Sequence, residues 1–295
     1  MSDYHFHSSQ SNIFSGRQTS YERARYVIVG VPFDFTSSYR PGARFAPNVI
    51  REASANLETY SFRSGVDVED LPIHDMGDLH VSQDVSKTLE RVEFTVNRLV
   101  KAGKLPVLIG GEHTLTLGAA RGVSGKDLAV IDFDAHLDLR NCYQDLAISH
   151  TTFLRRLNEE LKPKKIVLIG PRATCKEELA YAEGEGMELY STHRIREEGV
   201  KETGRAISKA LSGCKHTYLT VDMDVLDPAY APGVQNPEPE GLTMQTLLDL
   251  IYELVDPRLI CVDLVEVTPA YDNGITSIQA AKTLFEIISA HAKAT

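Results

Sequence analysis

Short apolar runs recur along the chain and are separated by segments in which apolar residues return every three or four positions. The runs are rich in Val, Ile and Leu, several have no polar face, and each is short enough for a buried strand. Strands are therefore predicted at residues 26–31, around Ile73, and at 105–109, 128–131, 165–169, 187–190, 216–221 and 259–267.

The intervening segments have the spacing of amphipathic helices. Helices are predicted at residues 48–59, 85–100, 151–160, 175–184, 200–211, 243–254 and 276–291. Pro47 suits the first turn of the first of these helices, and Thr243 suits the N-cap of the sixth. Strands that alternate with helices predict an α/β fold with a parallel sheet covered on both faces. No repeat or linker divides the chain, so we predict one domain over residues 1–295, with residues 1–20 as a polar N-terminal extension.

Composition narrows the classes of partner. The formal net charge is 31 − 41 = −10, which disfavours nucleic acid and anionic membranes and favours a small cationic ligand. No apolar run approaches the roughly 20 residues that span a bilayer. The four cysteines are scattered without a paired motif, which indicates free thiols and a cytoplasmic location.

Chemistry concentrates at the end of one apolar run, in Asp132-Phe-Asp-Ala-His-Leu-Asp138. Asp134, His136 and Asp138 lie two residues apart, so in extended backbone their side chains would point to one side. Such a pattern can be the solvent-facing side of an edge strand, and the motif alone does not exclude that alternative. A divalent metal would explain it better if other segments supplied further ligands.

Two other predicted strands end in residues of the same kind. Asp222 and Asp224 follow the run at 216–221, and His113 follows the run at 105–109 through Gly110-Gly-Glu-His-Thr114. Two carboxylates at a buried strand end repel each other unless a cation neutralises them. The formal charge of the four carboxylates balances that of two divalent ions. With the two imidazoles they make an oxygen-rich, sulfur-free set, which favours Mn²⁺ over structural zinc.

Taken together, three motifs resemble the ureohydrolase (arginase/agmatinase) family, and most of all its agmatinase branch. They are Gly110-Gly-Glu-His-Thr, Asp134-Ala-His-Leu-Asp and Asp222-Met-Asp-Val-Leu-Asp-Pro-Ala-Tyr-Ala-Pro-Gly233, in the family's order. The resemblance implies a three-layer α/β/α sandwich around a mostly parallel sheet of about eight strands. It also implies assembly into homotrimers or homohexamers.

The resemblance also implies a role for each site residue, carried over motif by motif. It makes two manganese ions per chain the cofactor, with Asp134 and Asp222 touching both ions. Terminal ligands would be His113 and Asp138 on one ion, and His136 and Asp224 on the other. Outside the metal shell, His150 would contact substrate and shuttle protons, with Asp138 as the other candidate catalytic proton donor, and Glu266 would bind the substrate guanidinium.

The implied reaction is hydrolysis of a guanidino compound to urea and a primary amine, with agmatine as the leading substrate and putrescine as its amine product. Arg140 stands where arginases place an Asn that recognises the amino-acid end, which favours agmatine. If Arg140 faces the pocket without a partner such as Asp145, 4-guanidinobutyrate or another ω-guanidino acid becomes the better substrate. Gly233-Val-Gln-Asn-Pro237 also departs from the family's usual Gly-Thr-Gly-Thr-Pro. Arginase activity, a non-catalytic family member and a single-zinc deacetylase relative are the remaining alternatives.

Overall fold

The fold is described by a computed structural model that covers residues 8–9, 12–123, 125 and 127–295. Most of the predicted N-terminal extension before residue 12 lies outside this description. Its described part is built into the fold, because β1 (Ser8–Ser9) pairs antiparallel with Leu79 and Asp78. Phe14 is fully buried, and its ring meets that of Phe285 edge-on at 5.2 Å between centroids.

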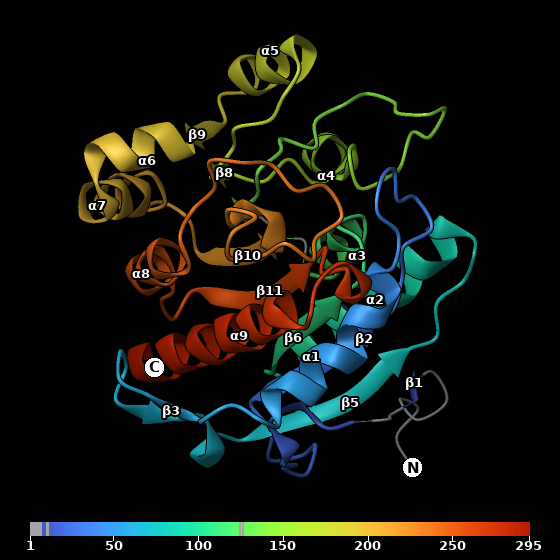
Figure 1. Cartoon of the computed structure of the whole chain (residues 1–295), viewed down its shortest axis with the longest axis vertical. Helices are drawn as coiled ribbons and strands as arrows, with labels where there is room; N and C mark the ends of the chain where they lie inside the picture. The colour runs from blue at the N-terminus through green and yellow to red at the C-terminus, as the bar shows by residue number, and fades with distance from the viewer. Residues whose placement is uncertain (1–7, 10–11, 124, 126) are drawn as a thin grey trace.

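One twisted sheet runs through the described chain in the strand order β1-β5-β2-β6-β11-β10-β7-β8-β9 (Figure 1). All neighbours after β1 are parallel, so eight parallel strands form the body of the sheet. Their bounds are β2 Tyr26–Val31, β5 Ile73–Leu79, β6 Leu105–Gly110, β7 Leu128–Phe133, β8 Lys165–Ile169, β9 Glu188–Tyr190, β10 His216–Asp222 and β11 Leu259–Val265. A separate hairpin pairs β3 (Tyr60–Ser61) with β4 (Val66–Asp67).

Helices cover both faces of the sheet and give the α/β/α sandwich that the resemblance implies. One layer holds α1 (Ala46–Ser54), α7 (Val200–Ala210), α8 (Met244–Leu254) and α9 (Ile275–Ala294), which contact one another in series. The other holds α2 (Val85–Lys101), α3 (Leu115–Val123) and α4 (Phe153–Leu161). Alternate strand residues face the two layers; Ile28 and Val107 join one apolar core, and Val29 and Leu108 join the other. Within the described residues, no helix is both long and apolar enough to cross a membrane.

The predicted elements are observed among the described residues, but several differ in their bounds; the last strand, expected at 259–267, ends at Val265. The helix expected at 48–59 ends at Ser54. Two helices were not predicted, namely α3 and α6 (Thr192–Glu198). All but one residue of α3 are buried, so it lacks the polar face that reveals a helix by its period. The remaining helix, α5 (Lys176–Gly184), begins one residue later than expected, after Cys175 at its N-cap.

The sheet order brings the chemistry-bearing segments together. Strands β6, β11, β10 and β7 are consecutive neighbours, and they are parallel, so their carboxyl ends meet at the same edge. Ligands of open α/β sheets collect at this edge. The predicted metal-binding residues lie after β6 and β7 and at the end of β10, where Asp222 is the last strand residue, and Glu266 follows β11.

Candidate metal centre and pocket

His113 reaches the centre because the backbone after β6 passes very close to its neighbours. The Gly111 N–H donates to the Val31 carbonyl, and a Cβ at Gly111 would stand 1.8 Å from the Phe33 carbonyl oxygen. Any side chain there would therefore displace the loop. The His113 ring lies 4.1 Å from the Phe153 ring between centroids, which fixes the imidazole plane.

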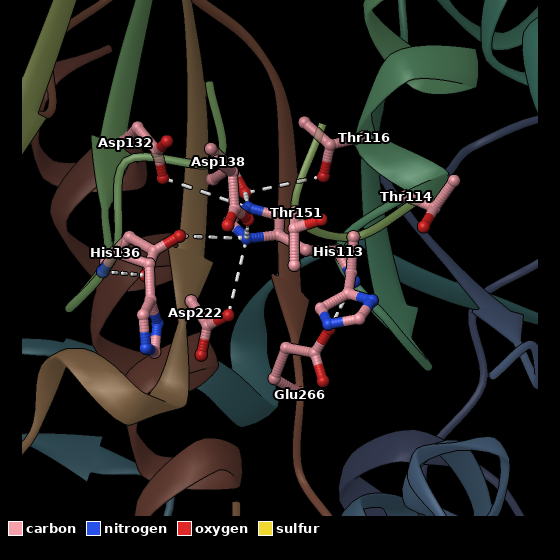
Figure 2. Close-up of polar contacts among 12 residues, drawn as sticks. His113, Thr114, Thr116, Asp132, His136, Asp138, Thr151, Asp222 and Glu266 are labelled. Carbon is pink, nitrogen blue, oxygen red and sulfur yellow. Dashed lines mark hydrogen bonds and ion pairs between the residues drawn. The ribbon is translucent and has the colours of Figure 1, made fainter. Parts of the chain in front are cut away.

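The segment after β7 turns its ligands inward by a route that differs from the sequence prediction. The strand ends at Phe133, and residues 134–138 form a loop in which Asp138 has a φ of 51°. The expectation that extended backbone aligns the three side chains was wrong, because the chain bends at Ala135 and His136, and Asp138 is left-handed. Asp134 and Asp138 nevertheless converge with His113, and Asp134 and His136 converge with Asp224. Figure 2 shows Asp138 and Asp222 beside the His113 side chain.

The six predicted ligands form two groups that share Asp134. Around His113 Nδ1 lie Asp134 Oδ2 at 3.2 Å, Asp222 Oδ2 at 3.3 Å and Asp138 Oδ2 at 3.5 Å. Around His136 Nδ1 lie Asp224 Oδ2 at 3.1 Å and Asp134 Oδ1 at 3.4 Å. In each group, three candidate ligand atoms lie within 4.8 Å of one another.

The donor atoms are arranged as a metal site requires. One oxygen of Asp134, Asp222 and Asp224 accepts a backbone N–H, from His136, Asp224 and Ala135 respectively. These bonds orient each carboxylate so that its second oxygen points toward a histidine Nδ1. Among the described residues, His113 Nδ1 and Asp134 Oδ2 are buried without a hydrogen-bond partner. Buried polar atoms are costly when unpaired, so these atoms fit coordination of a cation.

The titration of the cluster reflects its crowded negative charge. Burial and the charge of Asp134 raise the pKa of Asp138 to about 7, and burial with Asp224 and Asp134 raises that of Asp222 well above its usual value. Burial would lower the pKa of His113, but the neighbouring carboxylates of Asp134, Asp138 and Asp222 outweigh burial and raise it. Such a cluster favours whatever positive charge balances it, and two divalent cations do so without consuming protons.

Behind His113, a row of polar side chains crosses three strands within the sheet. Thr220 of β10 is in register with Asp132 of β7 and Asp263 of β11, and both acids are fully buried. His113 Nε2 lies 2.8 Å from Thr220 Oγ1, and that hydroxyl donates to Asp263 Oδ1 at 2.6 Å. Because the hydroxyl proton goes to Asp263, Nε2–H is the donor of the first bond, which leaves Nδ1 free to coordinate.

We expect Thr220→Val to weaken metal binding by about 10- to 100-fold, the usual effect of removing a group that orients a metal ligand. Valine keeps the shape but cannot accept the Nε2–H. Titration of the chelated protein with Mn²⁺ measures the change, and Thr220→Ser is the matched control that keeps the hydroxyl. Equal Mn²⁺ affinity in the valine and serine variants would show that the bond does not support the site.

Glu266 and His150 lie in the same pocket as the ligands. Glu266 has a φ of 66° and follows β11; its Oε1 accepts the His113 N–H at 2.6 Å, while its buried Oε2 has no partner among the described residues. Burial and the nearby Glu112 raise its pKa well above the usual value. His150 Nε2 lies 3.0 Å from Ser38 Oγ, and burial together with the charge of His136 lowers the pKa of His150 to about 4.

The pocket has a volume of about 500 Å³, and its outer wall carries charges of both signs. Arg140 lines it, with Nε 3.9 Å from Glu178 Oε2 and its guanidinium over the Tyr143 ring. Glu178, and not Asp145 as suggested from the sequence, is therefore the partner of Arg140. Glu238 also lines the pocket, with Oε1 4.0 Å from His136 Nε2 and 41% of its side chain exposed.

The segment Gly233–Pro237, whose sequence differs from the family's usual one, forms part of this wall. Val234 bridges Val267, and the Gln235 N–H donates to the Glu266 carbonyl, so the segment lies beside Glu266. The next residue, Asn236, lines the pocket. Arg172 holds the backbone at Glu238, two residues after Asn236. Its guanidinium donates to the backbone carbonyls of Asp224 and Glu238 at 2.7 and 2.8 Å.

Comparison with known proteins agrees with this geometry. The arginase family model matches residues 24–289, which is most of the chain. The chain belongs to the arginase family.

Arginase-family relatives match this chain over nearly its whole length. It is 37% identical to an agmatinase of Bacillus anthracis, over 94% of this chain and 95% of the relative. It is also 37% identical to an N(1)-aminopropylagmatine ureohydrolase of Thermococcus kodakarensis, over 92% of each. The crystal structure of an agmatine ureohydrolase of Thermoplasma volcanium superimposes with a TM-score of 0.90 at 36% identity, covering 97% of this chain and 95% of that one. The chain is thus a ureohydrolase-family enzyme, and its His/Asp clusters fit the binuclear metal site of that family.

Several residues of this arginase-family site were not found from the sequence. Glu112 stands inside the Gly110–Thr114 motif, and Thr220 lies two residues before the motif that begins at Asp222, but neither was singled out by its spacing. Asp263 lies in an apolar strand, where a buried acid was the only available signal. Thr36, Glu178 and Glu238 come from turns or helix ends whose sequences carry no distinguishing pattern.

Proposed function

We propose that this chain is a binuclear-manganese ureohydrolase that converts agmatine and water into putrescine and urea. The observation that carries the proposal is Glu266 Oε2, a buried acceptor with no partner among the described residues, in the same pocket as both ligand groups. A planar guanidinium satisfies such a carboxylate with charge-assisted hydrogen bonds.

The metal assignment follows from the donor set. His113, Asp134, Asp138 and Asp222 would hold one ion, and Asp134, Asp222, His136 and Asp224 the other. When bound, two such ions lower the pKa of a shared water into the neutral range and make it nucleophilic. Carboxylate oxygens dominate the set and sulfur is absent, which suits Mn²⁺.

The protein's own groups place the substrate and handle its proton. Glu266, whose direction is set by its bond from the His113 N–H, binds the guanidinium and presents the guanidino carbon to the metal side of the pocket. The departing amine nitrogen must gain a proton, and His150 and Asp138 are the candidate donors among the titratable groups that line the pocket. With a pKa near 4, His150 is neutral at pH 7 and receives a proton before it passes one on.

The outer wall supports a cationic tail over a carboxylate. Glu178 forms an ion pair with Arg140, so Arg140 is not available to bind a substrate carboxylate. Glu238 has an exposed carboxylate that can bind an amine. A second candidate is a guanidino compound with a longer cationic tail, such as N(1)-aminopropylagmatine. The pocket volume of about 500 Å³ and its two outer carboxylates favour that candidate. An ω-guanidino acid would instead need Arg140 released from Glu178. Cytoplasmic location stays a prediction from the unpaired cysteines, and trimeric or hexameric assembly stays a prediction from the family resemblance.

Urea release with Mn²⁺ tests the proposal against four substrates: agmatine, N(1)-aminopropylagmatine, 4-guanidinobutyrate and arginine. We expect kcat/KM to be highest for a cationic-tailed compound, and we expect Glu238→Gln to lower it for both cationic substrates more than for 4-guanidinobutyrate. Preference for 4-guanidinobutyrate, lost in Arg140→Gln, would assign the guanidino acid instead. No urea from any of the four would contradict the proposed reaction and favour a non-catalytic family member.

A further inference from the structure

A buried carboxylate, Glu112, lies behind His150 and is connected to it through one threonine hydroxyl. Thr36 is in the turn after β2, Glu112 follows β6, and His150 precedes α4, so three distant segments meet at this point. Glu112 is fully buried and Thr36 is 7% exposed. Neither side chain lines the substrate pocket. Thr36 contacts His150 directly, whereas Glu112 also lies near enough to Glu266 to raise the pKa of that residue, so the tests below change Thr36 and leave Glu112 in place.

We propose that Glu112 and Thr36 are positioning residues that hold His150 in the tautomer with its proton on Nδ1, leaving Nε2 as the acceptor that faces the pocket. The proposal rests on the proposed function for its catalytic meaning. It does not rest on that function for the tautomer itself, which is a property of the hydrogen-bond network.

Counting donors around Glu112 determines the direction of each bond. Glu112 Oε2 accepts the Thr36 N–H at 2.7 Å, and Oε1 accepts the hydroxyls of Thr36 and Thr114, each at 2.6 Å. A carboxylate that receives three donors acts only as an acceptor. The single hydroxyl proton of Thr36 is therefore donated to Glu112.

The consequence for His150 follows from that donation. Thr36 Oγ1 has only lone pairs left, and it lies 3.1 Å from the His150 backbone N–H and 3.3 Å from Nδ1. Both contacts are favourable only if His150 donates, so Nδ1 carries the proton. Nε2 then has a free lone pair, which can accept from Ser38 Oγ at 3.0 Å.

The same arrangement occurs at the metal ligand. Thr220 and Asp263 fix the proton of His113 on Nε2 and free Nδ1, whereas Thr36 and Glu112 fix the proton of His150 on Nδ1 and free Nε2. In each case a threonine hydroxyl donates its proton to a buried acid, and its oxygen then accepts an N–H from an imidazole. The two histidines are thereby prepared for different tasks, one for coordination and one for proton transfer.

Thr36→Val removes the hydroxyl that joins Glu112 to His150. It keeps the side-chain shape and the Thr36 backbone N–H that donates to Glu112. General acid–base catalysis contributes about 10²–10⁴-fold, so we expect the wrong tautomer to lower kcat by on the order of 10- to 100-fold. KM and manganese content should stay within about twofold, since Thr36 touches neither substrate nor ligand. Thr36→Ser should restore kcat to within about threefold. Ser37→Ala is the matched control, because the Ser37 hydroxyl in the same turn has no hydrogen-bond partner among the described residues.

A second readout reports the tautomer without any reaction. The ring nitrogens of His150 can be observed by ¹⁵N NMR in the whole chain loaded with Zn²⁺, a diamagnetic ion, and identified by their loss in His150→Gln. The spectra are recorded above about pH 8, well above the usual pKa of a carboxyl group. We expect a protonated Nδ1 in the wild type and in Thr36→Ser, and a mixture of tautomers in Thr36→Val.

Protonated Nε2 in the wild type, or full kcat in Thr36→Val, would overturn the inference. If the wild type hydrolyses none of the guanidino compounds, the proposed function fails. The NMR comparison still decides whether the Thr36 hydroxyl sets the tautomer, so the two failures are distinguishable.

Discussion

Replacing Asp134 with alanine is expected to remove bound metal and abolish measurable urea release. Among the described residues, Asp134 is the side chain common to both ligand groups, with Oδ2 3.2 Å from His113 Nδ1 and Oδ1 3.4 Å from His136 Nδ1. Its loss would remove a carboxylate ligand from both candidate metal positions and leave less negative charge to hold two cations. Asp222→Ala should behave in the same way.

Metal content by mass spectrometry, read beside the rate of urea release, measures both effects on one sample. Asp145→Asn is the matched control, because it removes a carboxylate from the loop that follows the motif while the side chain is exposed. We expect the control to keep two ions per chain and its rate. Unchanged manganese with full activity in Asp134→Ala would refute the two-metal site.

The second large effect is expected for Glu266→Gln. Removing one partner of a buried charge pair costs about 2–5 kcal/mol, so kcat/KM should fall by roughly 30- to 5,000-fold. The amide oxygen can still accept the His113 N–H, so the loop and the metal content should be preserved. The missing negative charge, and not a change of shape, is then the cause.

Kinetics of Glu266→Gln with agmatine, together with metal content, distinguish substrate binding from metal loss. Glu238→Gln neutralises an exposed carboxylate of the same pocket, and we expect only a few-fold change in kcat/KM from it. Equal losses in the two variants would show that Glu266 has no special contact with the guanidinium. Loss of metal in Glu266→Gln would place this residue in the metal shell instead.

Most predicted strands match the observed ones because buried parallel strands are short and apolar. Their bounds can therefore be predicted from the local run of apolar residues. Strand β2 is observed at its predicted bounds, and β8 likewise. Helix α3 was missed because it is buried almost all round, and a helix without a polar face has no readable period. Helix α6 is short, and Gly199, with a φ of 80°, separates it from α7.

The candidate site was predictable in its residue types but not in its geometry. The three motifs named six candidate ligands, five of which fall in the two His/Asp clusters, and Asp222 lies beside His113. The alignment of Asp134, His136 and Asp138 was predicted from extended backbone, yet Asp138 has left-handed φ. Local spacing cannot report such a residue, because Asp tolerates that region and gives no distinctive signal there.

By itself, the sequence determined the α/β class, the positions of most elements and the identity of the chemical groups at three strand ends. These features depend on which residues prefer burial, and that preference is local. Only the tertiary structure decided that β6, β11, β10 and β7 are neighbours, that Thr220 joins His113 to Asp263, and that Glu178 takes Arg140. Each of those contacts joins segments far apart in the chain, and its geometry depends on strand order and on backbone turns that no local pattern encodes.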